Sequence, residues 1–214
     1  MNPIIPNFKA PELIETWPHA IATYFFDRDI TEEEKNLALE LCKDLRKNEG
    51  NAHTTDIRVL DNPGFKEIKE FCLKCVKSYL TFVLDPLPGV EPYITISWIN
   101  VTEQGQSHHR HSHPNSLLSG VFYLNANQEE DSIIFLRPVY KRILYHRLNT
   151  TKYNSDSCKL PVHSGNLVLF DSEIEHTVFP TTGDHARLSL SFNVFVKGIV
   201  GEEQSLTYLD LKGE

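Results

Sequence analysis

A series of short strand-like runs in the second half of the chain limits the fold more than any other feature. From about residue 93 onward, runs rich in β-branched and aromatic residues alternate with turn residues, which is typical of β-strands. The runs read YITISWIN, LLSGVFYLN, SIIFL, NLVLF, HTVFP and RLSLSFNVFV. Because helix-like stretches precede them, we expect a mainly β chain with flanking helices (α+β), and a jelly roll best suits this many short strands.

The residues before these strands predict two helices and one short strand. Thr31 followed by Glu34 is a capping box, and Gly50 follows the predicted end of the first helix. The second helix is predicted over residues 63–84, where apolar residues recur at helical spacing. The sequence ATYFFD, at residues 22–27, predicts a short strand.

The length of 214 residues allows one sizeable core. We therefore expect residues 1–214 to form a single domain. Within it, residues 1–92 are predicted to form an N-terminal arm and supporting helices, residues 93–197 the jelly-roll core, and residues 198–214 a C-terminal strand or tail.

Charge and composition exclude several classes of protein. The net charge of -8 argues against general nucleic-acid binding or a membrane-surface role. No run is apolar enough to span a membrane, and no secretory signal is visible, so we expect a cytoplasmic protein. The four scattered cysteines fit a reducing compartment, and Cys72-x-x-Cys75 is interpreted as core packing because it lies on an apolar helix face.

Four of the ten histidines lie between residues 108 and 113, in a predicted polar turn between two apolar runs. Histidine is the commonest metal ligand in proteins. A His-x-His step leaving a strand points both rings to one side, so His111 and His113 are candidate ligands of one metal ion, with His176 as the third. The pair His109 and His111 is an alternative frame.

The last strong strand carries one polar and one apolar face. With a period of two, the polar face carries Arg187, Ser189, Ser191 and Asn193. An arginine fork followed by a serine hydroxyl suits a carboxylate. His176 precedes Arg187 by eleven residues, a distance that an antiparallel hairpin can span, so we expect a metal ligand and a carboxylate anchor in one cavity.

This order of residues resembles the Fe(II)/2-oxoglutarate-dependent oxygenases, which have a double-stranded β-helix (jelly-roll, cupin-like) core. The phrases WIN-V, HSHP and SGVFYL are similar to a family of such oxygenases in bacteria and phages, over about residues 93–197. The resemblance implies that His111 and His176 bind iron. It also implies that Arg187 and Ser189 hold the C5 carboxylate of 2-oxoglutarate. The remaining cosubstrate candidates are Tyr123, which matches a tyrosine of prolyl-hydroxylase-like members, and Asn100.

One residue departs from the family pattern. The usual ligand set has two histidines and one carboxylate, yet His113 occupies the position of the Asp or Glu. His113 is either the third ligand of an all-histidine site, or a carboxylate from elsewhere or a water takes that place. Glu173 and Glu175 are interpreted as loop charges, and His163 and His185 as solvent-facing residues.

The resemblance implies a dioxygenase that hydroxylates an unidentified substrate and releases succinate and CO2. Its partners would be Fe(II), 2-oxoglutarate, O2 and a small molecule or protein side chain. A cupin-like three-histidine dioxygenase without 2-oxoglutarate and a non-catalytic jelly-roll binding module are the alternatives. The basic segment 137–152, with Arg142 and Arg147, is either a solvated hairpin or a site for an anionic substrate. The sequence also leaves a homodimer as one of the possible partners of the chain.

Overall fold

Two antiparallel sheets and two helices make up the computed structural model, which describes residues 19–137, 146 and 148–211. The larger sheet contains β1 (Ile21–Phe25), β2 (Leu45–Lys47), β3 (Ala52–Thr54), β4 (Glu91–Thr102), β6 (Leu118–Asn125), β9 (Asn166–Asp171), β11 (Arg187–Val200) and β12 (Leu209–Leu211). The smaller sheet contains β5 (His108–His111), β7 (Ser132–Leu136), β8 (Ser157–Pro161) and β10 (His176–Val178). The predicted mainly β architecture is confirmed.

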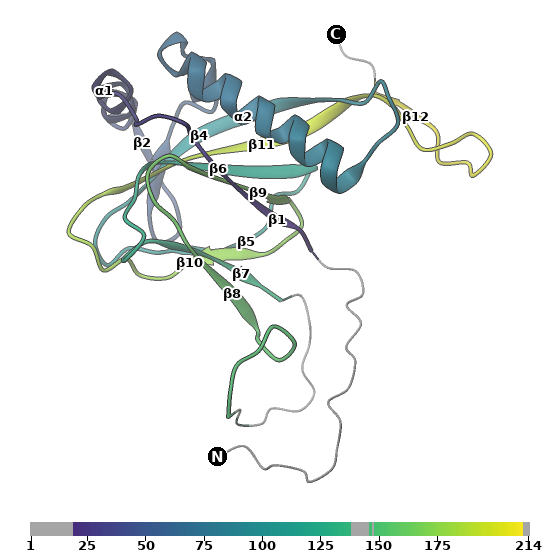
Figure 1. Ribbon diagram of the computed structural model, residues 1–214. Helices are drawn as coiled ribbons and strands as arrows, with labels where there is room; N and C mark the ends of the chain where they lie inside the picture. The colour runs from purple at the N-terminus through teal and green to yellow at the C-terminus, as the bar shows by residue number, and fades with distance from the viewer. Residues whose placement is uncertain (1–18, 138–145, 147, 212–214) are drawn as a thin grey trace.

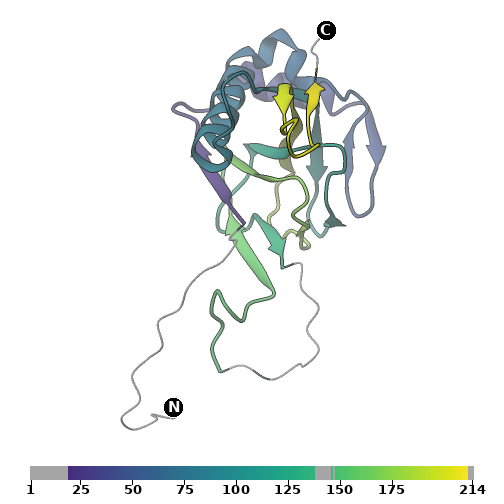
Figure 2. The same cartoon turned by 90° about the vertical axis from the view of Figure 1, so that its right-hand side faces the viewer.

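The helices lie over the outer face of the larger sheet, and the smaller sheet lies against its inner face (Figure 1). The larger sheet has the strand order β1-β9-β6-β11-β4-β3-β2, and β12 pairs with β11 at one end. The smaller sheet has the order β5-β10-β7-β8. Figure 1 shows the β11–β12 hairpin extending beyond this layered body, and in Figure 2 the same hairpin points toward the viewer.

Side-chain alternation along β11 and β6 separates two apolar cores. Leu188, Leu190, Phe192 and Val194 pack with the helices, as the sequence predicts for the apolar face of the last strand. Val121 and Tyr123 of β6 point the other way, into a smaller core between the two sheets. The polar residues of β11 share that inner side, which places them in the space enclosed by the sandwich.

The first helix has the predicted start and an unexpected end. Helix α1 (Glu32–Leu41) begins with the capping box, in which Thr31 Oγ1 accepts from the Glu34 amide and the Glu34 carboxylate accepts from the Thr31 amide. The expected continuation toward Gly50 is wrong, because the chain turns after Leu41 and forms β2. Pairing with β3, which itself pairs with β4, outweighs a weak helical preference at this sheet edge.

The second helix is confirmed over residues 63–84 with irregular ends. After the short turn η1 (Val59–Asp61), it begins with a 3₁₀ turn, η2 (Pro63–Phe65), continues as α2 (Lys66–Tyr79) and closes with a π turn, η3 (Leu80–Leu84). Cys72 and Cys75 lie in the outer core, as predicted, and burial raises the pKa of the Cys75 thiol to about 11. No helix among the described residues has the length and hydropathy needed to cross a membrane.

The histidine-rich segment is not the predicted polar turn, because residues 108–111 form strand β5. This strand pairs with β10, and a bulge shifts the register, so that His111 is opposite His176 while His108 is opposite Val178. Between these two pairs, two residues of β5 (His109 and Arg110) therefore face one residue of β10 (Thr177). A bulge next to a functional site commonly redirects side chains, and here it turns neighbouring histidines toward the same side.

Candidate metal centre and cosubstrate cavity

Three histidines from edge strand β5, its neighbour β10 and the loop after β5 form a compact cluster. The candidate ligand atoms of His111, His113 and His176 all lie within 4.8 Å of one another. His111 ends β5 and His176 begins β10, and the two are direct partners in the antiparallel ladder, with ring centroids 4.3 Å apart. Strand pairing therefore brings together two histidines that are 65 positions apart in the sequence.

His113 is positioned by contacts on both sides of its ring. Its backbone amide donates to the carbonyl of Ser172 at 2.9 Å, which fixes the loop after β5. Its ring lies 5.8 Å from the Trp98 ring and 5.2 Å from the His176 ring, nearly parallel to both. These contacts hold His113 beside the other two imidazoles.

Backbone carbonyls define which ring nitrogen of each neutral histidine can bind a metal. His111 Nδ1 lies 2.8 Å from the carbonyl oxygen of His109, and His176 Nδ1 lies 3.0 Å from that of Ile174. Since a carbonyl accepts a hydrogen bond, each Nδ1 carries the proton and each Nε2 keeps its lone pair. This arrangement is typical of metal-binding histidines, in which the ring nitrogen that does not bind the metal donates a hydrogen bond to a neighbouring acceptor.

Burial keeps these imidazoles neutral. Loss of solvent contact, followed by the neighbouring rings, lowers the pKa of His113 to about 4 and that of His176 to about 3. Burial also lowers the pKa of His111. Metal ions bind neutral imidazole, so at neutral pH the cluster offers lone pairs without first releasing protons.

The opposite wall of the cavity carries a buried guanidinium. Arg187 is 2% exposed, and its partners are the Tyr123 hydroxyl at 3.3 Å and the Ser132 carbonyl at 3.4 Å, both uncharged. Its Nε has no hydrogen-bond partner among the residues that the structure describes. A buried cation with a free donor and no counter-ion among these contacts is costly unless an anion binds beside it. Ser189, next to Tyr123 in the ladder, lines the same cavity.

Asn100 joins the two sides of the cavity. Its amide nitrogen donates to Ser191 Oγ at 2.9 Å, and its amide oxygen accepts from Trp98 Nε1 at 3.2 Å. Asn100 lines the cavity, as proposed from the sequence. Trp98 does so as well, and it is half-buried and stacked on His113 rather than packed into the core.

The predicted hairpin between His176 and Arg187 is wrong, although both residues line one cavity. His176 belongs to the smaller sheet and Arg187 to the larger sheet. They meet across the sandwich because the two sheets pack face to face. The chain between them crosses from one sheet to the other, so both residues line the same cavity although their strands do not pair.

Comparison with known proteins agrees with this geometry. Residues 96–193 match the family model described as "Putative 2OG-Fe(II) oxygenase". Over these residues, a little under half of the chain, the sequence is similar to that family. The resemblance found in the sequence is thereby confirmed, including the phrases around His111, His113 and His176, which lie inside the matched segment.

Solved structures share the fold at low sequence identity. A prolyl hydroxylase from Trichoplax adhaerens, solved with a hypoxia inducible factor peptide fragment, has a TM-score of 0.56 and 18% identity, covering 82% of this chain and 83% of that one. A Pseudomonas putida prolyl-4-hydroxylase has a TM-score of 0.53 and 17% identity, covering 82% and 92%. HygX from Streptomyces hygroscopicus, solved with nickel, 2-oxoglutarate and hygromycin B, has a TM-score of 0.56 and 12% identity, covering 82% of each chain. No curated protein sequence matches the chain. The predicted jelly roll is confirmed.

The remaining predicted residues lie away from the inner cluster. Glu175 forms an ion pair with Arg110 at the surface, which supports its interpretation as a loop charge. Among the described residues, the metal-ligand clusters contain histidine alone, so no carboxylate from this part of the chain completes the cluster. Arg142 and Arg147 lie outside the described residues.

His163 and His185 are less exposed than predicted. His163 is half-buried and its ring stacks on that of Phe25. His185 Nε2 lies 2.8 Å from a carboxylate oxygen of the buried Asp131, which ties the start of β11 to the loop before β7. The sequence shows these residues beside turns, but not the partners that cover them.

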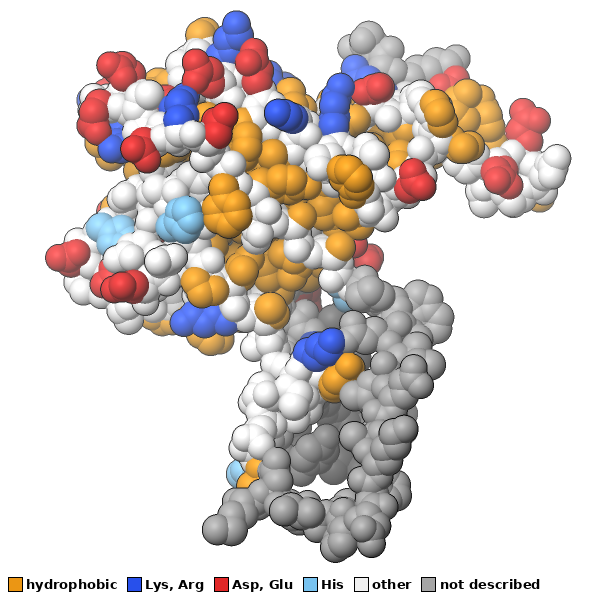
Figure 3. Space-filling model, viewed as in Figure 1, with side chains coloured by type: hydrophobic (Ala, Val, Ile, Leu, Met, Phe, Trp, Pro, Cys, Tyr) orange, Lys and Arg blue, Asp and Glu red, His pale blue; other side chains and the backbone are white. Residues whose placement is uncertain are grey.

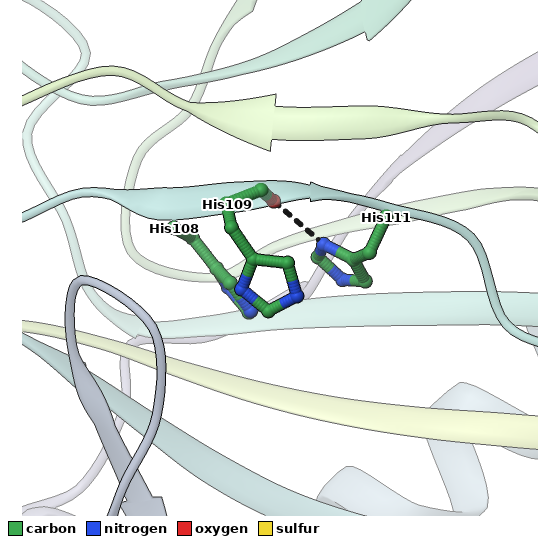
Figure 4. Close-up of side chains that lie close together, drawn as sticks. All are labelled: His108, His109 and His111. Atoms are coloured by element: carbon green, nitrogen blue, oxygen red, sulfur yellow. Dashed lines mark hydrogen bonds between the residues drawn. The ribbon is translucent and has the colours of Figure 1, made fainter.

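Two features of the histidine-lined cavity were not assigned from the sequence. His108 lines the same cavity as His111 and His113, and the strand bulge that turns it there has no sequence signal. His108, His109 and His111 form a second close group, drawn in Figure 4. Two hints of this group were present in the sequence, namely the density of histidine in this segment and the alternative pair of His109 and His111.

Proposed function

We propose that this chain is an Fe(II)- and 2-oxoglutarate-dependent dioxygenase that hydroxylates a C–H bond of its substrate. The overall reaction converts the substrate, O2 and 2-oxoglutarate into the hydroxylated product, succinate and CO2. The observation that carries the proposal is the buried Arg187 guanidinium, whose Nε has no partner among the described residues, in the same closed cavity as three neutral imidazoles. A dicarboxylate with one end on a metal ion fits that pair of features.

In this proposal, His111, His113 and His176 hold Fe(II) through their Nε2 atoms. With Fe(II) and 2-oxoglutarate bound, the site supplies oxygen activation coupled to decarboxylation of the cosubstrate. The backbone carbonyls at His109 and Ile174 keep the ring tautomers correct. The Trp98 ring stacks on His113 and covers one face of that imidazole.

The carboxylate end of the cosubstrate is held by the opposite wall. Arg187 provides the charge and the free Nε donor, and the Ser189 and Tyr123 hydroxyls add hydrogen bonds to the same group. Asn100 orients the Ser191 hydroxyl beside them. The planar guanidinium of arginine both attracts the carboxylate and fixes its orientation, whereas the ammonium group of a lysine would supply only the charge.

The test is anaerobic addition of Fe(II), then 2-oxoglutarate, to metal-free protein while the visible spectrum is recorded. We expect a weak charge-transfer band that requires both additions and is absent in Arg187→Ala. Succinate, a C4 acid that lacks the keto group, is the matched control ligand and gives no band. Iron binding without a band after 2-oxoglutarate addition contradicts the cosubstrate assignment.

A cupin-like three-histidine dioxygenase without 2-oxoglutarate is the second candidate. The observation that favours it is the all-histidine composition of the cluster among the described residues. It leaves the buried charge of Arg187 without a function, so we rank it second. It predicts oxygen consumption that depends on metal but is unchanged when 2-oxoglutarate is omitted.

A further inference from the structure

A second group of three histidines lies on the outer side of the proposed iron site. The candidate ligand atoms of His108, His109 and His111 all lie within 4.8 Å of one another, and all three side chains are half-buried. Their ring centroids are 4.4 to 5.1 Å apart. Consecutive residues of a regular strand point to opposite faces, yet Figure 4 shows all three rings on one side of β5. The bulge in β5 accounts for this.

The two histidine groups form a path from an open cavity to a closed one. His109 lines only the outer cavity, whose volume is about 270 Å³, while His176 lines only the inner cavity. His108, His111 and His113 line both. Every step along this path, from His109 to His111 to His176, joins rings whose centroids are less than 5 Å apart.

His111 belongs to both groups but can bind one ion at a time. Its Nδ1 faces the His109 carbonyl at 2.8 Å, so Nε2 is its single free lone pair. An ion in the outer group therefore excludes an ion in the inner group. Two sites that share one ligand in this way allow an ion to pass between them while His111 stays bound.

The hairpin of β2 and β3 makes the outer group the weaker of the two. Asn48 Nδ2 lies 3.1 Å from His108 Nε2, and Asn48 Oδ1 accepts from the Glu49 amide, which orients the side chain toward the ring. The lone pair of His108 is thus already engaged by a neutral donor. An ion in the outer group must displace that contact, whereas His111 and His176 present free lone pairs to the inner position.

We propose that His108, His109 and His111 form an outer, transient site for a divalent transition-metal ion, which loads the inner His111–His113–His176 site. Imidazole ligands suit Zn²⁺, Cu²⁺, Fe²⁺ and Ni²⁺, so the outer site takes ions of this class. The inference rests on the proposed function only in its assignment of the inner site as the resident iron position. Ion binding by the outer group itself does not depend on that assignment.

The first experiment measures Co²⁺ binding at equilibrium by absorbance, with a chelator competition for affinity. His176→Ala breaks the inner group and is expected to keep one weaker Co²⁺ ion with a changed spectrum. In the double variant His176→Ala/His109→Ala, the affinity for Co²⁺ is expected to fall by more than about 100-fold relative to His176→Ala. Loss of a residue that hydrogen-bonds a ligand costs about 10–100-fold in metal affinity, and loss of a direct ligand costs more. His113→Ala is the second way to break the inner group, and folding is checked by circular dichroism.

The second experiment follows the rate of Co²⁺ uptake by the metal-free chain with only the outer group changed. His109→Ala is expected to bind one ion with near-native affinity but at least about tenfold more slowly, because the outer landing position is lost. His53→Ala is the matched control, since His53 lines the outer cavity without belonging to the group, and its uptake rate is expected to be native.

The outcomes separate this inference from the proposed function. If His176→Ala binds no Co²⁺, or binds it equally well with and without His109, the outer site does not exist. If His109→Ala loads at the native rate, the outer site has no loading function. If the native chain binds Co²⁺ only through His108, His109 and His111, the inner-site assignment fails while the outer site stands.

Discussion

Arg187 and Tyr123 meet inside the sandwich, with a guanidinium nitrogen 3.3 Å from the phenol oxygen and the guanidinium carbon 5.1 Å from the ring centre. The ring and the hydroxyl together orient a buried cation whose Nε has no partner within the described part of the chain. This pair defines the anionic end of the proposed cosubstrate site, and three of the predictions below concern that site or the metal cluster opposite it.

Replacing Arg187 by alanine is expected to weaken 2-oxoglutarate binding at least about 30-fold, because loss of one partner of a buried charged pair costs about 2–5 kcal/mol. Arg187→Lys keeps the charge but loses the planar fork of donors, so its affinity for 2-oxoglutarate should lie between those of the native chain and Arg187→Ala. Calorimetry on the metal-loaded protein measures the effect. Tyr123→Phe, which removes one hydroxyl, is the milder control. Native affinity in Arg187→Ala contradicts the assigned cosubstrate wall.

Replacing His113 tests the unusual third ligand. His113→Ala is expected to lower Co²⁺ affinity more than about 100-fold, whereas His113→Asp, which restores the usual carboxylate, is expected to retain most of it. The Co²⁺ absorption bands of His113→Asp should shift because an oxygen ligand replaces nitrogen. Unchanged affinity and bands in His113→Ala would show that His113 is not a ligand.

The metal-free protein is expected to lose stability as pH falls from 6.5 to 5. The ordinary histidine pKa is 6.5, while burial lowers the pKa to about 4 for His113 and about 3 for His176. Between these values the unfolded chain binds protons that the folded chain does not, so the free energy of unfolding falls by up to about 1.4 kcal/mol per pH unit for each such histidine.

Urea unfolding at pH 7.5 and pH 5 measures this dependence. In His176→Ala one of the depressed groups is absent, so the difference between the two midpoints should be smaller than in the native chain. A native chain equally stable at both values contradicts buried, neutral imidazoles. The window stays above pH 5 so that carboxylate titration contributes little.

Gly120 is expected to tolerate no side chain. It lies opposite Phe192 in the ladder of β6 and β11, and a Cβ there would be 2.2 Å from Phe192 Cζ. Gly120→Ala must displace a fully buried ring and should lower the free energy of unfolding by about 1–3 kcal/mol. Urea unfolding measures it. The double variant Gly120→Ala/Phe192→Leu, which frees the space, should recover part of the loss.

Acidic and basic side chains alternate over the helical layer on the face shown in Figure 3. That layer covers the outer core and leaves the inner cavity between the sheets. The charges of this layer thus lie away from the proposed chemistry, which depends on the few polar side chains of β11 and of the histidine segment.

The sequence by itself determined the strands from residue 93 onward, the capping box at Thr31 and the two faces of β11. These features follow from local spacing, because alternation and helical periodicity depend only on which residues must be buried. The candidate residues His111, His176 and Arg187 were also evident, since their types and order match a known family.

Only the tertiary structure decided how those residues meet. It placed His176 and Arg187 on opposed sheets, made a strand of residues 108–111, and ended the first helix at Leu41. Each of these outcomes depends on pairing or packing between segments distant in sequence, which leaves no local pattern. The bulge that turns His108 and His109 to one side is of the same kind, because the partner strand sets its register.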